Sequence, residues 1–448
     1  MSRTRELAGF LAGLSGRVED RLLEVATDAV LDTVGAMVYG ADQPWTKAAH
    51  SHALTTGGEG PSTVIGAGRS TSPAMAAFAN GCAGHAFELD DVHEEAISHP
   101  GAVVVPAALA LAERHEASGR EFLEAVLIGY EAMGRAGIAV GPASHMLGGF
   151  HPTSMSGVFG SAAAAGRLLG FDEDRLTHAF GVAVSLASGT MEFAASGGMA
   201  KRMHAGRAAE GGLLAAALVA NGFHGAGDGL AGTYGFASVF TDAPQVHLLT
   251  EGLGERWMSD ELTIKPYAAC SDIHPMIQAA AELRAEHGFV AEDVVRIRAE
   301  GPTKAATQNS LDGTVSVMAA QYSAEFNIAA AILADPRDPE TYTPSRIADP
   351  ELAALQARVV SVDSAPEFDE TYAWKMGGRV RIELTDGRVL ERTVRGQKGS
   401  MHSPLTADEL GEKFAKLVTG RVADVDALTT AVRSLARGGS VSALSAAL

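Results

Sequence analysis

The chain has 448 residues, of which 46% are hydrophobic and 20% are charged. This balance is typical of a folded globular protein with room for two or three domains. Asp and Glu number 54 against 35 Lys and Arg, so the formal net charge is −19. Such an acidic chain is a poor candidate for binding nucleic acid or an anionic membrane, because both interactions depend on basic surfaces. A small anionic substrate is still compatible, since a pocket can be locally basic.

Cysteine usage and the N-terminal residues point to the cytoplasm. The two cysteines, Cys82 and Cys270, are too few for a disulfide scaffold, a four-cysteine zinc site or a cluster held by three or four cysteines of this chain. Residues 1–20 carry six charged side chains and no sustained apolar run, so we expect no secretory signal. The most apolar later stretch, 103–112, is about half as long as a membrane span. We therefore expect a cytoplasmic protein of enzyme size.

The first 265 residues show the pattern of helices separated by glycines. Apolar residues recur at helical spacing over 22–34, and Gly40 follows as a stop signal. The same pattern predicts further helices over 106–114, 121–135, 153–169, 172–186 and 205–220. Aromatic residues make up only 6% of a chain that contains 51 glycines. We therefore expect these helices to pack closely through small side chains.

Strand patterns begin near residue 270. β-Branched alternation predicts strands over 294–298 and 359–362, and residues 379–394 predict a hairpin with Asp386-Gly387 in its turn. Helical stretches lie between the strands, at 276–287 and 324–334, and the pattern is helical again from residue 405. The fold class predicted is mainly α, with a large all-helical domain and an inserted smaller α+β domain. We place the helical domain at 1–268 plus 400–448 and the α+β domain at 269–399.

Common catalytic motifs are missing from the sequence. It contains no Gly-x-Ser-x-Gly elbow, no His-Glu-x-x-His pair and no Walker A loop. The spacing of Gly227, Gly229 and Gly232 matches the dinucleotide fingerprint by letters. However, these glycines follow a predicted helix, and no βαβ pattern surrounds them. We interpret them as a flexible loop.

A dense polar segment extends from His85 to Gly101. It contains three histidines and five carboxylates: His85, Glu88, Asp90, Asp91, His93, Glu94, Glu95 and His99. Like charges this close repel, so such clustering favours a function or a bound cation. Three interpretations are open: a general-base and carboxylate site, a metal site, or a solvated loop with capping Asp residues. His99 is the most informative residue, because it titrates near neutrality and precedes a rigid proline.

A second candidate is His151, which stands before Pro152 and Thr153 at the expected start of a helix. The positive end of the helix dipole favours a neutral imidazole and attracts anions. A neutral imidazole there could act as a base. The alternative is a helix-entry histidine with an ordinary hydrogen bond.

A third candidate is a group of basic residues, Lys201, Arg202, His204 and Arg207, at the N-terminal edge of a predicted helix. Cations oppose the helix dipole there, and a bridging carboxylate or phosphate would resolve the conflict. The alternative is a solvated basic edge paired with acidic residues.

The fourth candidate is Lys265 with Pro266 and Tyr267, at the expected domain junction. Clefts between domains commonly bind ligands, so Lys265 is a candidate carboxylate anchor or acid/base. It could equally be a hinge residue without chemistry.

These segments, in this order, resemble the MmgE/PrpD family over nearly the whole chain. The matching blocks are Asn80-Gly81 through Gly101, Phe150-His151-Pro152, Lys201-Arg202-x-His204-x-Gly206, Lys265-Pro266-Tyr267 and Pro404 through Phe414. The resemblance implies that a carbanion forms next to a carboxylate of a small di- or tricarboxylate. Dehydration, decarboxylation and epimerisation all occur in this family.

The resemblance also implies an arrangement of domains and residues. It implies a helical domain and an α+β lid with the site between them, a homodimer, and no obligatory cofactor. It implies that the catalytic residues are His99, His151, Lys201 and Lys265. The substrate-binding candidates are Glu88, Asp90, Asp91, Arg202, His204 and Tyr267. In this scheme His99 and His151 move protons on opposite faces of the substrate, and Lys201, Arg202 and Lys265 stabilise the enolate-like charge.

Two departures from the family pattern bear on the reaction. The acidic block usually reads Asp-x-Asp-Asp-Thr, whereas here it is Glu88-Leu89-Asp90-Asp91-Val92, and Phe326 stands where relatives carry a Tyr. The lost hydroxyls favour dehydration, as in 2-methylcitrate dehydratases, over decarboxylation of cis-aconitate, with epimerisation as a further alternative. Two other classes stay open: a non-catalytic carboxylate-binding homologue, and a metal-dependent enzyme using His85, Asp91 and His93.

Overall fold

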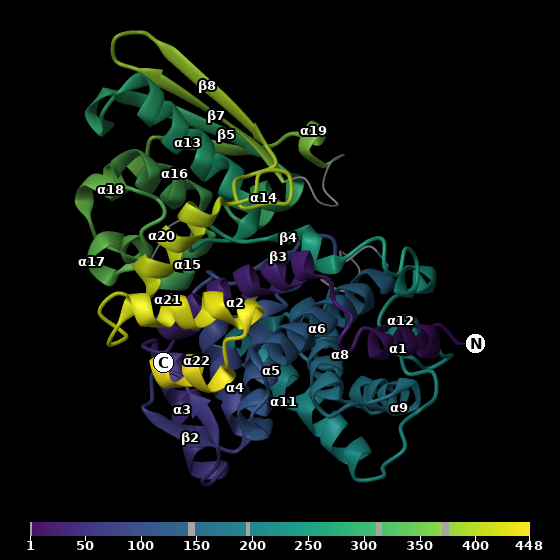
Figure 1. The fold of residues 1–448 in the computed structure, drawn as a ribbon. Helices are drawn as coiled ribbons and strands as arrows, with labels where there is room; N and C mark the ends of the chain where they lie inside the picture. The colour runs from purple at the N-terminus through teal and green to yellow at the C-terminus, as the bar shows by residue number, and fades with distance from the viewer. Residues whose placement is uncertain (1, 142–147, 194–197, 311–315, 370–375) are drawn as a thin grey trace. The chain divides into compact units, whose positions relative to one another are not determined.

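The computed structural model describes residues 2–141, 148–193, 198–310, 316–369 and 376–448. The chain divides into two compact units. The helical unit comprises Met1–Leu262 and Leu410–Leu448, and the second unit comprises Thr263–Glu409. Helices dominate the described residues (Figure 1), which confirms the mainly α class. The arrangement of the second unit as a lid stays a prediction.

The helical unit contains many helices and a few very short strands. Its α-helices are α1 (Arg3–Gly13), α2 (Asp20–Gly40), α3 (Pro44–Thr56), α4 (Pro73–Gly84), α5 (Gly101–His115), α6 (Gly119–Ala139), α8 (Pro152–Leu168), α9 (Glu173–Ala183), α11 (Ala200–Ala220), α12 (Phe236–Val239), α21 (Val425–Ser434) and α22 (Val441–Ala447). Its strands are β1 (Ser62–Val64), β2 (Arg69–Thr71) and β3 (Val92–His93). Short 3₁₀ turns are η1 (Val184–Leu186), η2 (Val246–Leu249), η3 (Met258–Glu261) and η7 (Leu435–Arg437). Helix α20 (Ala407–Val418) and strand β4 (Leu262–Thr263) span the unit boundaries.

Helix α5 is the centre of the helical unit. It contacts α2, α4, α6, α8 and α11, and every residue from Gly101 to Ala112 is buried. A helix that is apolar all round belongs in a core, which agrees with its Val- and Ala-rich sequence. The helix starts directly after His99-Pro100, so the polar segment of the sequence lies at the N-terminal end of this buried helix.

Small residues let the helices approach closely, as expected from the composition. Where α4 meets α11, a Cβ atom on Gly81 would lie 2.8 Å from the Cα of Gly206. A Cβ atom on Gly206 would lie 2.3 Å from the carbonyl oxygen of Phe78. These distances are too short for any side chain, so the two backbones touch only because both residues are glycine. This contact fixes the N-terminal half of α11, which carries Lys201, Arg202 and His204.

The second unit contains a four-stranded sheet in the order β6-β5-β7-β8. Its strands are β5 (Val294–Gly301), β6 (Val359–Ser364), β7 (Gly377–Leu384) and β8 (Val389–Arg395). Strand β5 pairs parallel with β6 and antiparallel with β7. Strands β7 and β8 form the expected hairpin, in which Gly387 adopts a φ of +86° at the turn.

Helices accompany this sheet. They are α13 (His274–His287), α14 (Thr303–Gln308), α15 (Val317–Tyr322), α16 (Ala324–Leu333), α17 (Pro344–Ile347), α18 (Pro350–Gln356) and α19 (Pro366–Asp369), with 3₁₀ turns η4 (Ser271–Ile273), η5 (Ala291–Asp293) and η6 (Pro339–Tyr342). Helix α13 packs on β7 and β8, and α16 packs on α13 (Figure 1). The predicted strands and helices of this region are therefore confirmed.

Two helices begin five residues earlier than their sequence patterns predict. The helix expected over 205–220 starts at Ala200, so Lys201 and Arg202 lie in its first turn. The helix expected from residue 106 starts at Gly101 and includes Pro106. In the described part of the chain, no helix combines the length and apolar character needed to cross a bilayer.

The α4–α11 contact predicts a clear difference between two glycines of α11. We expect Gly206→Ala to lower the free energy of unfolding by about 1–3 kcal/mol, because the added methyl group overlaps backbone atoms. Gly211→Ala is the matched control, since its Cβ would meet nothing closer than 3.4 Å and alanine favours the helix. Urea denaturation of both variants is the measurement. Equal effects of the two changes would contradict this account.

Candidate active site

The polar segment 85–100, called here the site loop, joins α4 to α5 and contains β3. In the described chain, three residues other than glycine have a positive φ, and two of them are in this loop: Glu88 (56°) and Ile97 (47°). The third, Glu116, ends α5. A left-handed conformation is costly for side chains of this kind, especially for a β-branched one, by about 1–3 kcal/mol. The site loop is therefore strained and must be held by its surroundings.

Asp91 connects the site loop to the start of α5. Its Oδ1 accepts a hydrogen bond from the backbone N–H of Gly101 at 2.8 Å, and its Oδ2 accepts one from the Tyr130 hydroxyl at 2.8 Å. A Cβ on residue 101 would lie 2.8 Å from Oδ1 and 2.4 Å from Thr33 Oγ1. Glycine at 101 is thus a condition for placing a carboxylate at the N-terminus of the central helix.

His99 is oriented by the backbone of the same loop. Its Nδ1 lies 2.7 Å from the carbonyl oxygen of Asp91. A carbonyl can only accept, so Nδ1 carries the proton, and Nε2 is the basic nitrogen of the neutral ring. The backbone N–H of His99 donates to Thr153 Oγ1 at 3.2 Å. The side chain is 12% exposed, which leaves it accessible to a small ligand.

The Asp90 carboxylate lies close to both neighbouring histidines, His85 and His99. His85 Nδ1 donates to its Oδ2 at 2.6 Å, and His99 Nδ1 lies 3.4 Å from the same oxygen. The rings of His85 and His99 meet edge to face at 5.1 Å. Burial lowers the pKa of His85, although the Asp90 charge opposes this effect. His85 is therefore a buried neutral ring whose proton position is set by Asp90.

A second histidine pair adjoins the first. His151 caps the N-terminus of α8, and its ring lies 5.5 Å from that of His85. His151 Nδ1 and His204 Nδ1 are 3.1 Å apart, so one donates and the other accepts. Burial lowers the pKa of His151 well below its usual range and that of His204 to about 4, with neighbouring charges adding to the effect. Both rings are neutral near pH 7.

The two cations of α11 share one carboxylate. Glu88 Oε1 accepts from both Lys201 Nζ and Arg202 Nη1, the latter at 2.7 Å. Arg202 Nη1 also donates to the carbonyl oxygen of His85 at 3.2 Å, and its guanidinium lies 5.7 Å from the centre of the Trp45 ring. All three charged side chains are buried. Two buried cations that share a carboxylate form a locally basic group suited to binding a further anion.

The structure therefore gathers most of the expected site residues within the helical unit. These are His99, His151, Lys201, Glu88, Asp90, Asp91, Arg202 and His204. Arg207 lies outside the group, because it is exposed and pairs with Glu210 on the same helix. Lys265 and Tyr267 belong to the second unit, where both are buried and the Tyr267 ring meets His274 at 5.1 Å.

The expected metal ligands do not come together. His93 Nε2 lies 3.7 Å from Glu261, and both Asp91 oxygens are engaged by Gly101 and Tyr130. A different trio, His85, Asp90 and His99, offers one ligand atom each within 4.8 Å. However, Nδ1 of His99 must keep its proton to bond a carbonyl, and the charge of Lys201 acts on His85. We interpret this trio as a hydrogen-bonded relay.

Two residues that contact the site loop, Tyr130 and Lys413, lie in no catalytic motif of the sequence. Tyr130 sits in the apolar helix α6 and is identified only by its contact with Asp91. Lys413 comes from α20, far along the chain, and its Nζ donates to the carbonyl of Leu89 at 2.8 Å and to Asp32. Lys413 lies in a block that matches the family pattern, which is the one clue the sequence offers to its role.

Asp91 predicts a pH-dependent stability. Burial, followed by the charge of Asp32, raises the pKa of Asp91 from 3.8 to about 7. Between these values the folded protein holds a proton that the unfolded chain has lost. The stabilising contribution is therefore complete below about pH 3.8 and is lost as the pH rises through about 7.

We expect Asp91→Asn to flatten the decline in the free energy of unfolding across this pH window. The measurement is urea denaturation at a series of pH values. Asp242→Asn, at an exposed position, is the control and should leave the pH dependence as it is. An unchanged slope in Asp91→Asn would refute the assignment.

Comparison with known proteins places this geometry in a family. The sequence matches the MmgE/PrpD N-terminal domain over residues 5–249 and the MmgE/PrpD C-terminal domain over residues 267–437. A cis-aconitate decarboxylase of Aspergillus terreus is 30% identical over 444 residues, covering 94% of this chain and 90% of that protein. The cis-aconitate decarboxylase of Homo sapiens is 29% identical over 430 residues, covering 92% and 87%. That of Mus musculus is 26% identical over 430 residues, covering 92% and 86%.

Both domain matches and the full-length relatives agree with the ordered sequence blocks. The chain therefore belongs to the MmgE/PrpD family.

Proposed function

We propose that this protein is a lyase that decarboxylates a small tricarboxylate of the cis-aconitate type. The observation that carries the proposal is the pair of buried cations, Lys201 and Arg202, which both donate to Glu88. Family membership and cis-aconitate decarboxylase relatives support a lyase-type reaction on a polycarboxylate. A substrate carboxylate beside these two cations would be held by charge-assisted hydrogen bonds.

The chemistry requires that negative charge on carbon be stabilised. In decarboxylation, one carboxylate leaves as CO₂, its bonding electrons pass into the rest of the substrate, and a proton is then added at carbon. Cations beside a remaining carboxylate stabilise the enolate-like intermediate. Lys201 and Arg202 are suited to this role, because burial strengthens their electrostatic effect. We assign Lys265 a similar role as a proposal.

Proton transfer falls to the histidines. His99 presents Nε2 as its basic nitrogen, since Nδ1 is held by the carbonyl of Asp91. His151 and His204 form a neutral pair in which a proton can be shared across 3.1 Å. Neutral imidazoles can accept a proton and return it, which suits them to general acid–base catalysis near pH 7. We propose His99 and His151 as the proton carriers.

Dehydration is the second candidate reaction. It needs a base to remove a proton and an acid to assist the leaving hydroxide, and the site contains two separate histidine systems, His99 and the His151–His204 pair. The two departures from the family pattern have less weight than the sequence alone suggests. Phe326 is fully buried and lies 5.9 Å from the Tyr342 ring in the second unit, and Val92 is also buried. We rank decarboxylation first because full-length relatives are cis-aconitate decarboxylases.

The test separates binding from chemistry. The purified protein is incubated with cis-aconitate, citrate and 2-methylcitrate, and products are identified by NMR together with released CO₂. We expect CO₂ from cis-aconitate, and interconversion without CO₂ would favour dehydration or hydration instead. No turnover of any of the three acids, with no thermal stabilisation by them, would overturn the proposal.

Variants of the site predict distinct losses. We expect Lys201→Ala to abolish both the ligand-induced rise in melting temperature and turnover, because it removes a binding cation. His99→Gln should keep the thermal shift while kcat falls about 10²–10⁴-fold. Arg207→Ala is the matched control on the same helix, because this exposed arginine lies outside the cluster. Loss of activity in the control equal to that in Lys201→Ala would contradict the assignment.

We also propose that the protein forms a homodimer. The helical unit exposes several large apolar side chains, Leu214, Phe223, Tyr234 and Val239, with exposed fractions of 44%, 54%, 88% and 56%. Such side chains are commonly buried by a second subunit. Light scattering should give about twice the chain mass of 46.2 kDa. A mass of one chain at micromolar concentration would refute the dimer.

A further inference from the structure

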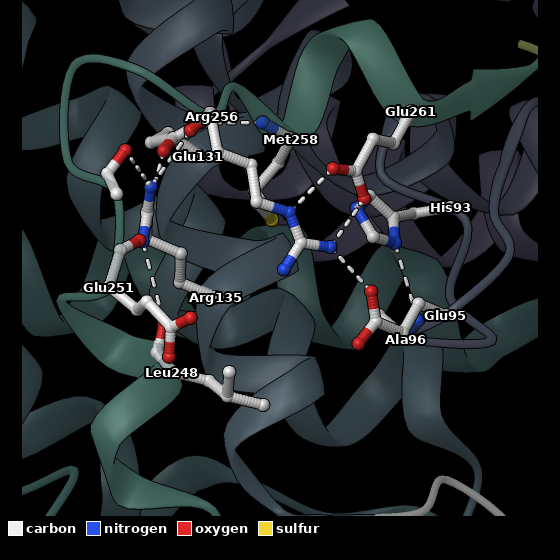
Figure 2. Close-up of polar contacts among 11 residues, drawn as sticks. His93, Glu95, Ala96, Glu131, Arg135, Leu248, Glu251, Arg256, Met258 and Glu261 are labelled. Atoms are coloured by element: carbon white, nitrogen blue, oxygen red, sulfur yellow. Dashed lines mark hydrogen bonds and ion pairs between the residues drawn. The ribbon is translucent and has the colours of Figure 1, made fainter. Parts of the chain in front are cut away.

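A ring of four charged or polar side chains fastens the site loop to the segment that precedes the second unit. Arg256 donates to Glu261 through Nε at 2.6 Å and Nη2 at 2.7 Å, and Nη2 also donates to Glu95 at 2.5 Å. Glu261 Oε2 lies 3.7 Å from Nε2 of His93. Figure 2 shows Glu95 and His93, both from the site loop, facing Arg256 and Glu261. We call these four residues the Arg256 clamp.

The Arg256 clamp contacts a tight turn, residues 93–98, that ends beside His99. His93 N–H donates to the carbonyl of Ser98 at 2.8 Å, and Ser98 N–H donates back at 3.3 Å. Between them, Ile97 adopts a φ of +47°. A β-branched residue keeps that conformation only where the surroundings impose it. Because His99 follows Ser98 directly, the conformation of this turn determines the position of the His99 backbone.

His93 is oriented toward the clamp by its own turn. The backbone N–H of Ala96 donates to His93 Nδ1 at 3.2 Å. Burial lowers the pKa of His93, so the ring is neutral and carries its proton on Nε2. That N–H faces the Glu261 carboxylate, whose charge is shared with Arg256. The contact is therefore favourable without any protonation of His93.

Helix α6 holds the segment that carries Arg256. Arg135 of α6 is fully buried and donates to the backbone carbonyls of Glu251 at 2.8 Å and Arg256 at 2.9 Å, and Glu131 accepts from the N–H of Met258 at 2.9 Å (Figure 2). The residue before Glu131 is Tyr130, which holds Asp91. One helix thus fixes both the segment that carries Arg256 and the carboxylate at the start of α5.

We propose that Arg256 is a positioning residue: the Arg256 clamp holds the strained turn 93–98 and thereby sets the orientation of His99. The inference deepens the proposed function and rests on it, because it assigns a residue that acts through the proton carrier without touching substrate. Arg256 and Glu95 are about one-third exposed, at 35% and 30% of their side chains. Ion pairs of that exposure contribute little to global stability, so the clamp acts mainly on local geometry.

The primary experiment compares Arg256→Gln with Arg21→Gln. Arg21 is the matched control, because it makes a two-point ion pair with Asp260 in the same segment and does not contact the site loop. We expect Arg256→Gln to lower kcat about 10–100-fold with little change in KM or melting temperature, whereas Arg21→Gln keeps wild-type values. Equal losses in both variants, or a loss in Arg256→Gln that follows melting temperature, would overturn the positioning role.

Two further variants test the coupling. Glu95→Gln should reduce kcat, and the Glu95→Gln/Arg256→Gln double variant should be no worse than the poorer single one, because both changes break the same clamp. Ile97→Gly removes the strain, so Arg256→Gln should cost less activity in that background than in the wild type. Additive effects in both cycles would contradict the proposal.

A spectroscopic readout keeps this inference separate from the proposed reaction. In ¹⁵N spectra of histidine-labelled protein, His99 should show the Nδ1–H tautomer, assigned by its absence in His99→Gln. We expect Arg256→Gln to shift or broaden that signal while the tricarboxylate-induced thermal shift stays. If no acid is turned over but the His99 signal responds, the reaction assignment fails and the clamp stands. An unchanged signal would refute the clamp.

Discussion

The carboxylate of Asp91 at the N-terminus of α5 is the interaction on which the rest of the site depends. It accepts from Gly101 and Tyr130, and the carbonyl of the same residue holds His99. The apolar central helix, the strained loop and His99, the proposed proton carrier, are therefore joined at one residue. The close approach requires glycine at 101, which explains physically why a glycine follows the His-Pro pair.

Electrostatics divide the cluster into two parts. Burial keeps His85, His151 and His204 neutral, and the nearby charge of Lys201 lowers their pKa values further. Lys201 and Arg202 both donate to Glu88, which provides a counterion for the two cations. The left-handed backbone at Glu88 is the local strain that accompanies this placement. The site thus combines fixed positive charge with rings that can exchange protons, which is what carbanion chemistry beside a carboxylate needs.

The sequence predicted those features of the fold that depend on residues close together in the chain. Helical periodicity, the hairpin around Gly387 and close helix packing through small residues were all accessible from the sequence, as was the grouping of His99, His151 and Lys201 through the family blocks. The contact partners of side chains far apart in the sequence could not be predicted in this way. Apart from the family block, which ends at Gly206, the residue pattern does not separate Arg207 from Arg202. Arg207 pairs with Glu210 at the surface, whereas Arg202 is buried on Glu88. Burial settles that difference, and burial is a property of the packed fold.

The same reasoning explains why the family leaves the reaction open. In the proposed mechanism, Lys201, Arg202 and the histidines would stabilise an enolate and move protons whichever group departs. The choice between losing CO₂ and losing water depends on which substrate bond lies perpendicular to the enolate plane, and thus on how the acid is oriented between the cations and His99. Groups that orient His99 therefore bear on selectivity as well as rate. On this argument the Arg256 clamp, two steps removed from the substrate, belongs to the determinants of the reaction and not only to the scaffold.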